Sequence, residues 1–440
     1  MKKNRPFQLN RRGFLAGGAI GLSGYLLRSL AIGLPPAWLS RPLTAFGQDE
    51  NTNGYQTLIL STSSAGDPIN ANCPGSYASG LEHNPLLTHV DFNLGTMQTR
   101  GAESWALLPE NLRARMAFFH YRTDAAAHIE YRSAMTFHGS VKNGAGNGSE
   151  MFASAMSELS HAHIGTLQQE PLPLCNEVLT VAGQPLQNLK PNELKSLFAG
   201  DSEDLDNIGD LRDSALDALH ADLRANGTRS QRKFLDQYAL SKTQARALGE
   251  NLGSILDALP TDPENPDNAL DQVIAAVALA QLKVAPVITV NIPFGRDNHQ
   301  DSTLEIEAEQ TQTGTQVIAR LWQELEAANL TDDVTFATMN VFGRTLTRNG
   351  AGGRNHNRKH AVMTAFGPKI NPGVYGGATA NGECSSIDPV SGLAVSSGGI
   401  IPENTMSSMG KSLARALGHD SATVDQRISG GELVQSFLKT

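Results

Sequence analysis

Short apolar runs alternate with longer helical patterns along the chain from about residue 55 onward. Five runs rich in β-favouring residues predict buried strands, at residues 55–61, 116–121, 284–293, 334–339 and 361–366. Helical periodicity predicts helices at residues 269–282, 303–329, 410–417 and 432–438. We therefore predict an α/β fold, with a mostly parallel sheet covered by helices on both faces.

One long segment, at about residues 190–260, interrupts this alternation. It is rich in Leu, Ala, Asp, Arg and Gln, has helical periodicity, and contains no strand pattern. The turn-forming sequence PTDPENPDN follows it. We predict a helical insertion or cap within one α/β domain that covers residues 48–440.

The first 47 residues have a different pattern. Arg11 and Arg12 precede a glycine-containing apolar stretch, and the small residues Ala45 and Gly47 would allow cleavage before Gln48. This pattern is typical of a twin-arginine (Tat) export signal, which predicts a periplasmic or secreted protein carried by the Tat translocase. An uncleaved membrane anchor is the alternative, but Arg28 splits the apolar region, which is short for a membrane-spanning helix.

The charge of the chain argues against a nucleic-acid partner. The predicted signal contains seven basic and no acidic residues, so its removal changes the formal net charge from −9 to −16. Such an acidic protein lacks the basic face that nucleic acid requires. The three cysteines, Cys73, Cys175 and Cys384, have no metal-site spacing and would allow one disulfide plus a free thiol.

Polar side chains follow the predicted strands, and in parallel sheets ligands bind at the carboxyl ends of the strands. Asp67 follows the first run, and Asp297 and His299 follow the third. A carboxylate and an imidazole two residues apart can point the same way on an extended backbone, and they suit zinc, manganese or iron. A solvated turn at Asp297 and an Asx turn at Asp67 before Pro68 are the alternatives.

The loop after the second predicted strand offers further candidates. Asp124, His128 and His138 could serve as ligand, base or substrate contact, or could simply flank the start of a helix, with Asp124 as its N-cap. Thr123 and Ser133 are the hydroxyl groups available there for nucleophilic catalysis.

Residues 341–360 form a basic, glycine-rich stretch after the fourth predicted strand. They contain four glycines, five Lys or Arg residues and two histidines, His356 and His360, but no acid. The glycines favour a loop, in which only one of the two histidines is expected to be a ligand. Arginine binds phosphate and sulfate oxygens bidentately, so these side chains could face an anion or could offset the acidic surface elsewhere.

Several of these motifs resemble those of Tat-exported bacterial proteins in the family called domain of unknown function 1501. The corresponding stretches are Gly66-Asp67, Asp297-Asn298-His299, Phe342-Gly343-Arg344-Thr345, Gly352-Gly353-Arg354-Asn355-His356 and Gly373-Val374-Tyr375-Gly376. That family is similar to the alkaline phosphatase and sulfatase superfamily. The resemblance implies an alkaline-phosphatase-like fold with divalent metal at the strand ends, where it would bind the oxyanion of an ester.

The resemblance also implies roles for individual residues. The metal ligands would be Asp67, Asp297, His299 and His356, and Arg344 would be the oxyanion contact. Beside these, the loop after the second predicted strand supplies His128 and His138 as our acid–base candidates. The chain departs from the family pattern where two acids are replaced by Val341 and Asn355. Because fewer carboxylates can offset less positive charge, we expect one divalent metal at most (zinc, manganese, iron or calcium), with His360 as a substitute ligand.

These observations lead to two functional hypotheses. The first is an exported metal-dependent hydrolase that acts on a sulfate or phosphate ester of a small molecule or polysaccharide. The second is a catalytically degenerate envelope protein that binds an anionic polysaccharide or an envelope partner on the same fold. A structural subunit of a larger complex is a third interpretation.

Overall fold

A computed structural model describes residues 54–166, 168–198, 221, 225, 256–257, 259–295 and 297–439. The chain divides into two compact units, Met1–Gln48 with Leu189–Leu259, and Asp49–Asn188 with Pro260–Thr440. In the first unit the structure describes α8 (Pro191–Phe198). The predicted export signal and most of the predicted helical insertion lie outside the described residues.

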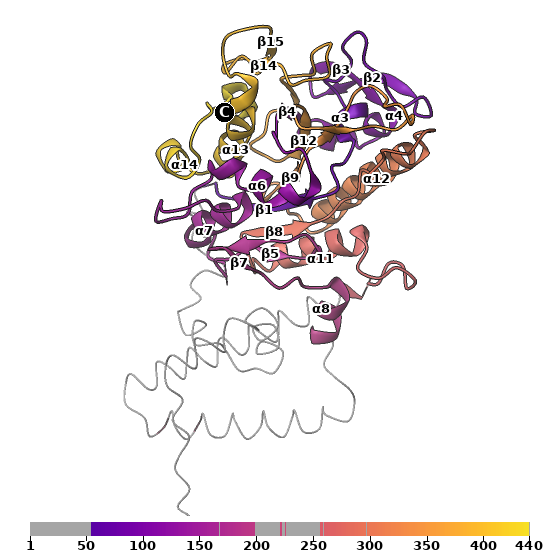
Figure 1. Ribbon diagram of the computed structural model, residues 1–440. Helices are drawn as coiled ribbons and strands as arrows, with labels where there is room; N and C mark the ends of the chain where they lie inside the picture. Colours follow the sequence, from indigo (N-terminus) through magenta and orange to yellow (C-terminus); the bar gives the residue numbers. More distant parts are fainter. Residues whose placement is uncertain are drawn as a thin grey trace, which may run out of the picture. The chain divides into compact units, whose positions relative to one another are not determined.

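The second unit is built on a seven-stranded sheet (Figure 1). Its strands, in spatial order, are β13 (Gly373–Tyr375), β4 (Met116–Tyr121), β12 (Ala361–Phe366), β9 (Val334–Asn340), β1 (Thr57–Ser63), β8 (Val287–Val290) and β5 (Leu172–Pro173). Only β12 runs antiparallel to its neighbours, β4 and β9, and the other pairings are parallel. The predicted α/β fold with a mostly parallel sheet is therefore confirmed.

Helices cover both faces of this sheet (Figure 1). On one side lie α11 (Ala269–Gln281) and α12 (Glu305–Ala327), and on the other α6 (Tyr131–Met135), α7 (Phe152–Ile164) and α13 (Thr405–Ala416). Neighbouring side chains of a strand point to opposite faces of the sheet, so a buried strand such as β4 needs helices or loops packed on both faces. Phe118 packs against Trp105, whereas Phe119 contacts Tyr375 and Phe437. Every residue of β1, β4, β8, β9 and β12 is buried.

Several predicted helices agree closely with the structure and one does not. The long helix predicted at 303–329 is α12, and the helix predicted at 269–282 is α11, which begins after Asn268 because its side chain caps the amides of Leu270 and Asp271. The helix predicted at 432–438 is wrong: that stretch forms only the short 3₁₀ turn η4 (Gln435–Phe437).

Smaller elements complete the second unit. They are α3 (Ile69–Asn72), β2 (His89–Leu94), β3 (Met97–Ala102), α4 (Glu103–Ala106), α5 (Glu110–Arg113), η1 (His128–Glu130), η2 (Phe137–Gly139), β6 (Thr180–Val181), β7 (Gln184–Pro185), β10 (Gly343–Arg344), β11 (His356–Asn357), β14 (Ser386–Ile387), β15 (Ala394–Val395), η3 (Pro402–Asn404) and α14 (Ser421–Arg427). Among the helices of the described residues, none is both long and apolar enough to span a membrane.

The reversed direction of β12 positions the glycine-rich loop. Residues 341–360 leave the carboxyl end of β9 and enter the amino end of β12, which pairs with the carboxyl end of β4 through Ala361 and Tyr121. The loop therefore begins and ends at the edge of the sheet where β1, β4, β8 and β9 have their carboxyl ends. Two short strands, β10 and β11, pair within it.

Candidate functional site

Loops from four strands meet at this carboxyl edge. The Nδ1 atom of His128, after β4, donates to the carbonyl of Ser64, after β1, at 2.7 Å. The Nδ1 atom of His356, in the loop after β9, donates to the carbonyl of Ala126 at 2.7 Å. The guanidinium of Arg344 lies 3.5 Å from the carboxylate of Asp297, after β8. Segments that are far apart in the sequence thus form one cluster of polar side chains.

Three imidazoles form the centre of this cluster. The ring of His356 meets those of His128 and His299 edge to face, with centroid distances of 4.7 and 4.6 Å. Phe342 stacks on the ring of His356, with the centroids 4.1 Å apart. Burial lowers the pKa of His356, so its ring is neutral at neutral pH.

The hydrogen bonds of these rings determine which nitrogen is available. A carbonyl oxygen only accepts, so the Nδ1 atoms of His128 and His356 carry hydrogen, and it is Nε2 that has the lone pair in the neutral form of each ring. The Nε2 atom of His356 is buried and has no hydrogen-bond partner among the described residues. A buried acceptor without a partner costs free energy, which marks this atom as one that a bound group would satisfy.

His299 stands between an anion and a cation. Its Nδ1 atom contacts the carboxylate of Asp297 and lies 3.0 Å from Nη1 of Arg344. Guanidinium only donates, so Nδ1 either donates to Asp297 or accepts from Arg344, and the two bonds are alternatives. Partial desolvation raises the pKa of Asp297, but the hydrogen bonds from His299 and the charges of His299 and Arg344 outweigh it and lower that pKa overall.

Arg344 is completely buried and is held mainly by backbone groups. Its Nε and Nη2 atoms donate to the carbonyls of Gly66 and Ala65 at 2.6 and 2.8 Å. Asn70 fixes the backbone of Arg344 from both sides, accepting from its amide at 2.9 Å and donating to its carbonyl at 2.7 Å. The cation is therefore positioned rigidly beside Asp297 and His299.

Asp67 lies between β1 and α3, and it is only 3% exposed. It accepts a hydrogen bond from the Ser63 hydroxyl at 3.1 Å. Burial raises the pKa of Asp67 to about 7, although the hydrogen bond from Ser63 and the charge of Arg344 act in the opposite direction. This carboxyl group is thus half protonated near neutral pH.

The predicted ligand set fits a metal only in part. Within the described part of the chain, no group of three or more His, Cys, Asp or Glu side chains is arranged to hold a metal ion. The carboxylates do not fit, because Asp67 is turned to Ser63 and Asp297 to Arg344 and His299. The imidazoles do fit in their chemistry: His128 and His356 each donate Nδ1–H to a carbonyl and keep Nε2 available, which is the usual pattern of metal-binding histidines.

Two of the other candidates lie outside the cluster. His138 contacts the carbonyl of Thr123 and the hydroxyl of Ser133 rather than the other histidines. Asp124 is paired with Arg122 at 2.6 Å and does not cap a helix, since η1 begins after Ala127.

The basic side chains of the loop are mostly engaged with protein groups. Arg354 is fully buried and paired with Glu307 of α12 at 2.6 Å. Arg348, Arg358 and Lys359 lie near the surface beside acids, at 3.8 Å from Glu82, 3.7 Å from Asp124 and 2.6 Å from Glu383. The loop therefore offsets acidic neighbours, which was the second of the two interpretations of its charge.

Sequence reasoning missed a buried chain of hydrogen bonds behind the site. Asn70 donates to Nδ1 of His360 at 3.1 Å, Nε2 of His360 donates to Nδ1 of His120 at 2.8 Å, and Nε2 of His120 donates to the carbonyl of Pro74 at 2.8 Å. Both nitrogens of His360 are thus used, so it is not available as a substitute ligand. No periodic or motif signal marks His120, which lies inside a strand pattern.

Two glycines allow the loop to approach its neighbours closely. A Cβ atom at Gly353 would lie 2.2 Å from the carbonyl oxygen of Asn298 and 2.4 Å from that of His299. A Cβ atom at Gly343 would lie 2.3 Å from the carbonyl of His360. Glycine is needed here because backbone meets backbone.

The three cysteines take no part in the site. Cys73, Cys175 and Cys384 are all buried and free, so the disulfide that the composition would allow does not form. Burial raises the pKa of Cys73 and Cys384 to about 12, which keeps these thiols protonated and unreactive.

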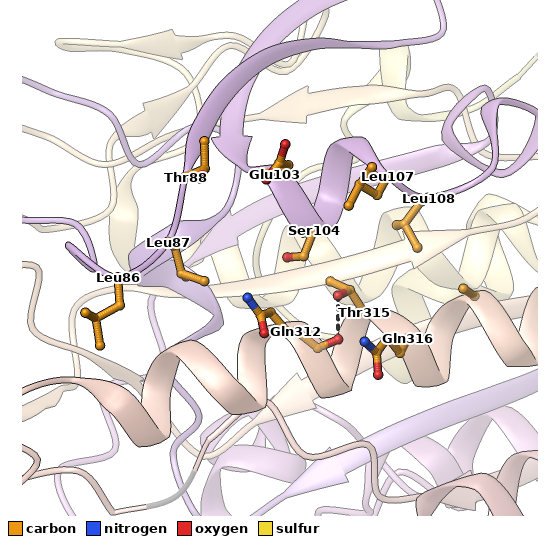
Figure 2. A pocket seen from close by; sticks show the side chains of 11 residues that line it. Leu86, Leu87, Thr88, Glu103, Ser104, Leu107, Leu108, Gln312, Thr315 and Gln316 are labelled. Atoms are coloured by element: carbon orange, nitrogen blue, oxygen red, sulfur yellow. Dashed lines mark hydrogen bonds between the residues drawn. The ribbon is translucent and has the colours of Figure 1, made fainter.

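A separate cavity of about 250 Å³ lies between α4, α12 and the segment before β2 (Figure 2). Leu86, Leu87, Leu107 and Leu108 form its apolar wall, and Gln312 and Gln316 of α12 lie across from them. It contains none of the predicted site residues.

The fold and the carboxyl-edge cluster define an α/β protein with a histidine-rich site at the strand ends. Residues 176–391 match the family model described as a protein of unknown function, DUF1501. This match supports the family that the motifs around Asp297, Arg344 and His356 resemble. A search among curated proteins found no match.

Proposed function

We propose that the protein is an exported hydrolase of phosphate or sulfate esters that uses one divalent metal, to which His128 and His356 would each offer Nε2 and His299 would turn its ring to add a third ligand. The support comes from the three rings that gather at the carboxyl edge, and above all from the buried Nε2 atom of His356, which has no partner in the described residues. A metal bound there would act as a Lewis acid toward an ester oxygen.

The chain's own residues would prepare this site. Hydrogen bonds to the carbonyls of Ser64 and Ala126 orient the rings of His128 and His356. Arg344 holds Asp297 and His299 in place from below and contributes a fixed positive charge near the place where an oxyanion would bind. We therefore assign Arg344 to positioning, and do not place it in direct contact with the substrate.

Metal content is the decisive measurement. The full chain, purified from cytoplasm and dialysed, is expected to contain about one equivalent of zinc, manganese or iron by mass spectrometry, and His356→Gln and His299→Gln are expected to lose it. His83→Gln, which changes a histidine outside the cluster, serves as the matched control and is expected to keep the metal. Metal retained in both cluster variants, or absent from the wild type, would rule the proposal out.

Substrate class is tested on the loaded protein with nitrophenyl phosphate and nitrophenyl sulfate. We expect hydrolysis of one of the two, abolished by EDTA and restored by the same metal. Bound metal without hydrolysis of either ester would separate metal binding from ester chemistry and overturn the second part of the proposal.

A metal-free anion-binding protein is the second candidate, and Arg344 is the observation that favours it. This buried cation already neutralises Asp297, and the position before Phe342 is the buried apolar Val341. Such a protein would bind a sulfated or uronic-acid polysaccharide equally well with and without EDTA. Loss of binding in EDTA would exclude this candidate.

We also propose export by the Tat translocase, on the twin arginine of residues 11–12 alone. Replacing Arg11 and Arg12 by Lys is expected to leave the protein in the cytoplasm, as seen by fractionation. Unchanged export of that variant would contradict the proposal.

A further inference from the structure

Ser133 and His138 form a hydrogen-bonded pair outside the histidine cluster. The Ser133 Oγ atom lies 3.0 Å from Nδ1 of His138, and Nε2 of His138 contacts the carbonyl oxygen of Thr123. Because the carbonyl only accepts, Nε2 carries the hydrogen and Nδ1 has the lone pair. In that tautomer the Ser133 hydroxyl donates to an imidazole that is oriented by a third group, which is the arrangement of an activated nucleophile.

The backbone that holds this pair is in an unfavourable conformation. Phe137 and His138 have φ values of +49° and +52°, and Asp124, next to Thr123, has +57°. These are three of the eight non-glycine residues with positive φ in the described part of the chain. Left-handed conformations at such residues cost free energy and concentrate at functional sites.

Tight packing maintains this conformation. The ring of Phe137 is 3% exposed and stacks on Phe152 at 5.3 Å. A Cβ atom at Gly410 would lie only 2.2 Å from the Phe137 ring, so α13 approaches it as closely as a glycine allows. The imidazole of His138 is therefore placed by a core residue directly before it.

The pair is accessible, and its surroundings indicate a substrate. Ser133 is half-buried and His138 is exposed. Ile129, in η1, precedes Ser133 of α6 by four residues in the chain. Ile129 is 91% exposed, so its side chain is free to contact an apolar acyl group.

We propose that Ser133 and His138 form a metal-independent nucleophilic site that hydrolyses carboxylic esters with a short apolar acyl chain. The Ser133 Oγ atom attacks the acyl carbon while its proton passes to Nδ1 of His138. The bond between the acyl carbon and the alkoxy oxygen then breaks, and the leaving alcohol takes that proton. Water, deprotonated by the same nitrogen, releases the carboxylic acid and restores the serine.

This site is separate from the proposed metal site, so each can fail without the other. The two share only the loop after β4, in which Thr123 contacts His138 and Ala126 contacts His356. All measurements on the serine site are therefore made in EDTA, where the proposed metal chemistry is absent.

The first test is covalent labelling of the full chain by a fluorophosphonate, which traps activated serines. We expect the label on the peptide that contains Ser133, and at least a tenfold slower reaction in His138→Asn. Asparagine tolerates positive φ, so this variant removes the base while keeping the backbone conformation. Ser160 is a matched internal control, because it also contacts a histidine, His419, at 3.0 Å but is 1% exposed.

The second test is hydrolysis of nitrophenyl hexanoate and nitrophenyl acetate. We expect Ser133→Ala to abolish both, and Ile129→Ser to raise KM for the hexanoate at least fivefold more than for the acetate. Labelling at other serines only, no labelling, or equal labelling rates in wild type and His138→Asn would overturn the proposal. Circular dichroism of each variant confirms that it is folded.

Discussion

Glu307 and Arg354 form a bidentate ion pair in which both side chains are completely buried, with oxygen–nitrogen distances of 2.6 and 3.2 Å. Glu307 also accepts hydrogen bonds from Asn72 at 2.8 Å and from Asn298 at 3.0 Å. One carboxylate of α12 thus joins the segments that follow β1, β8 and β9. The loops of the candidate site are held together by an acid that is not itself part of the site.

Breaking this pair is expected to destabilise the protein strongly. Arg354→Met leaves the Glu307 charge buried without its partner, which typically costs about 3–5 kcal/mol. Urea unfolding measures this cost. Arg348→Met, which changes an arginine near the surface of the same loop, is expected to cost less than about 1 kcal/mol.

The double variant Glu307→Gln with Arg354→Met tests the coupling. Removing both charges avoids the uncompensated one, so the double variant is expected to be more stable than the sum of the single changes predicts. Additive effects would contradict a direct interaction between the two side chains.

A methyl group at Gly353 is expected to disturb the site, whereas one at Gly350 is not. The Cβ atom at Gly353 would collide with the carbonyls of Asn298 and His299, and the Cβ atom at Gly350 would meet nothing within 4 Å. Gly353→Ala should therefore lower stability by more than about 1 kcal/mol and weaken metal binding through His299. Gly350→Ala is the control, and equal effects of the two changes would refute this explanation.

The buried pair His120 and His360 is expected to make the protein sensitive to acid. Burial lowers the pKa of His120 to about 4 and that of His360 well below its ordinary value. The unfolded chain takes up these protons near pH 6.5. Between about pH 6.5 and 4 the unfolded state therefore binds more protons, so the free energy of unfolding falls as the pH is lowered.

Unfolding in urea at several pH values measures this dependence. The slope is expected to decrease in His120→Gln, and an unchanged slope in that variant would show that the acid sensitivity arises elsewhere. His138→Gln, which changes an exposed histidine, is measured beside it for comparison.

Asp67 is expected to contribute a pH dependence of the opposite sign. Its pKa of about 7 lies above the ordinary value of 3.8, so between these values the folded state binds more protons than the unfolded state. Its contribution to the free energy of unfolding therefore decreases as the pH rises through this window. In metal-free protein, Asp67→Asn should raise the free energy of unfolding more at pH 8 than at pH 5. An equal increase at the two pH values would contradict the raised pKa of Asp67.

The architecture was predictable because strands that are buried on both faces are visible in the sequence as short runs rich in apolar and β-branched residues. The strands β1, β4 and β9 are rich in apolar and β-branched residues and are buried along their whole length, as strands of covered parallel sheets are. The reversal of β12 was not predictable in this way, because an apolar run has the same composition in either direction.

The sequence could predict which loops meet at the site, but not which side chains in them contact one another. Strand-end reasoning correctly brought His128, His299 and His356 to one edge, and the structure places them in ring contact. The sequence could not show that Arg354 is buried, because its partner Glu307 lies 47 residues earlier on another element. Nor could it show that Arg344 is turned inward toward carbonyls, since that depends on the backbone of Ala65 and Gly66.

Because β12 is antiparallel to β4 and β9, residues 341–360 leave the sheet at the end of β9 and return to it at the start of the adjacent β12, on the same edge. The separation of these two points is set by the sheet and not by the loop. The register of β12 is thus fixed by its own pairing with β4 and β9. Surface positions of the loop can vary without altering the sheet as long as Arg354 stays to pair with the buried Glu307.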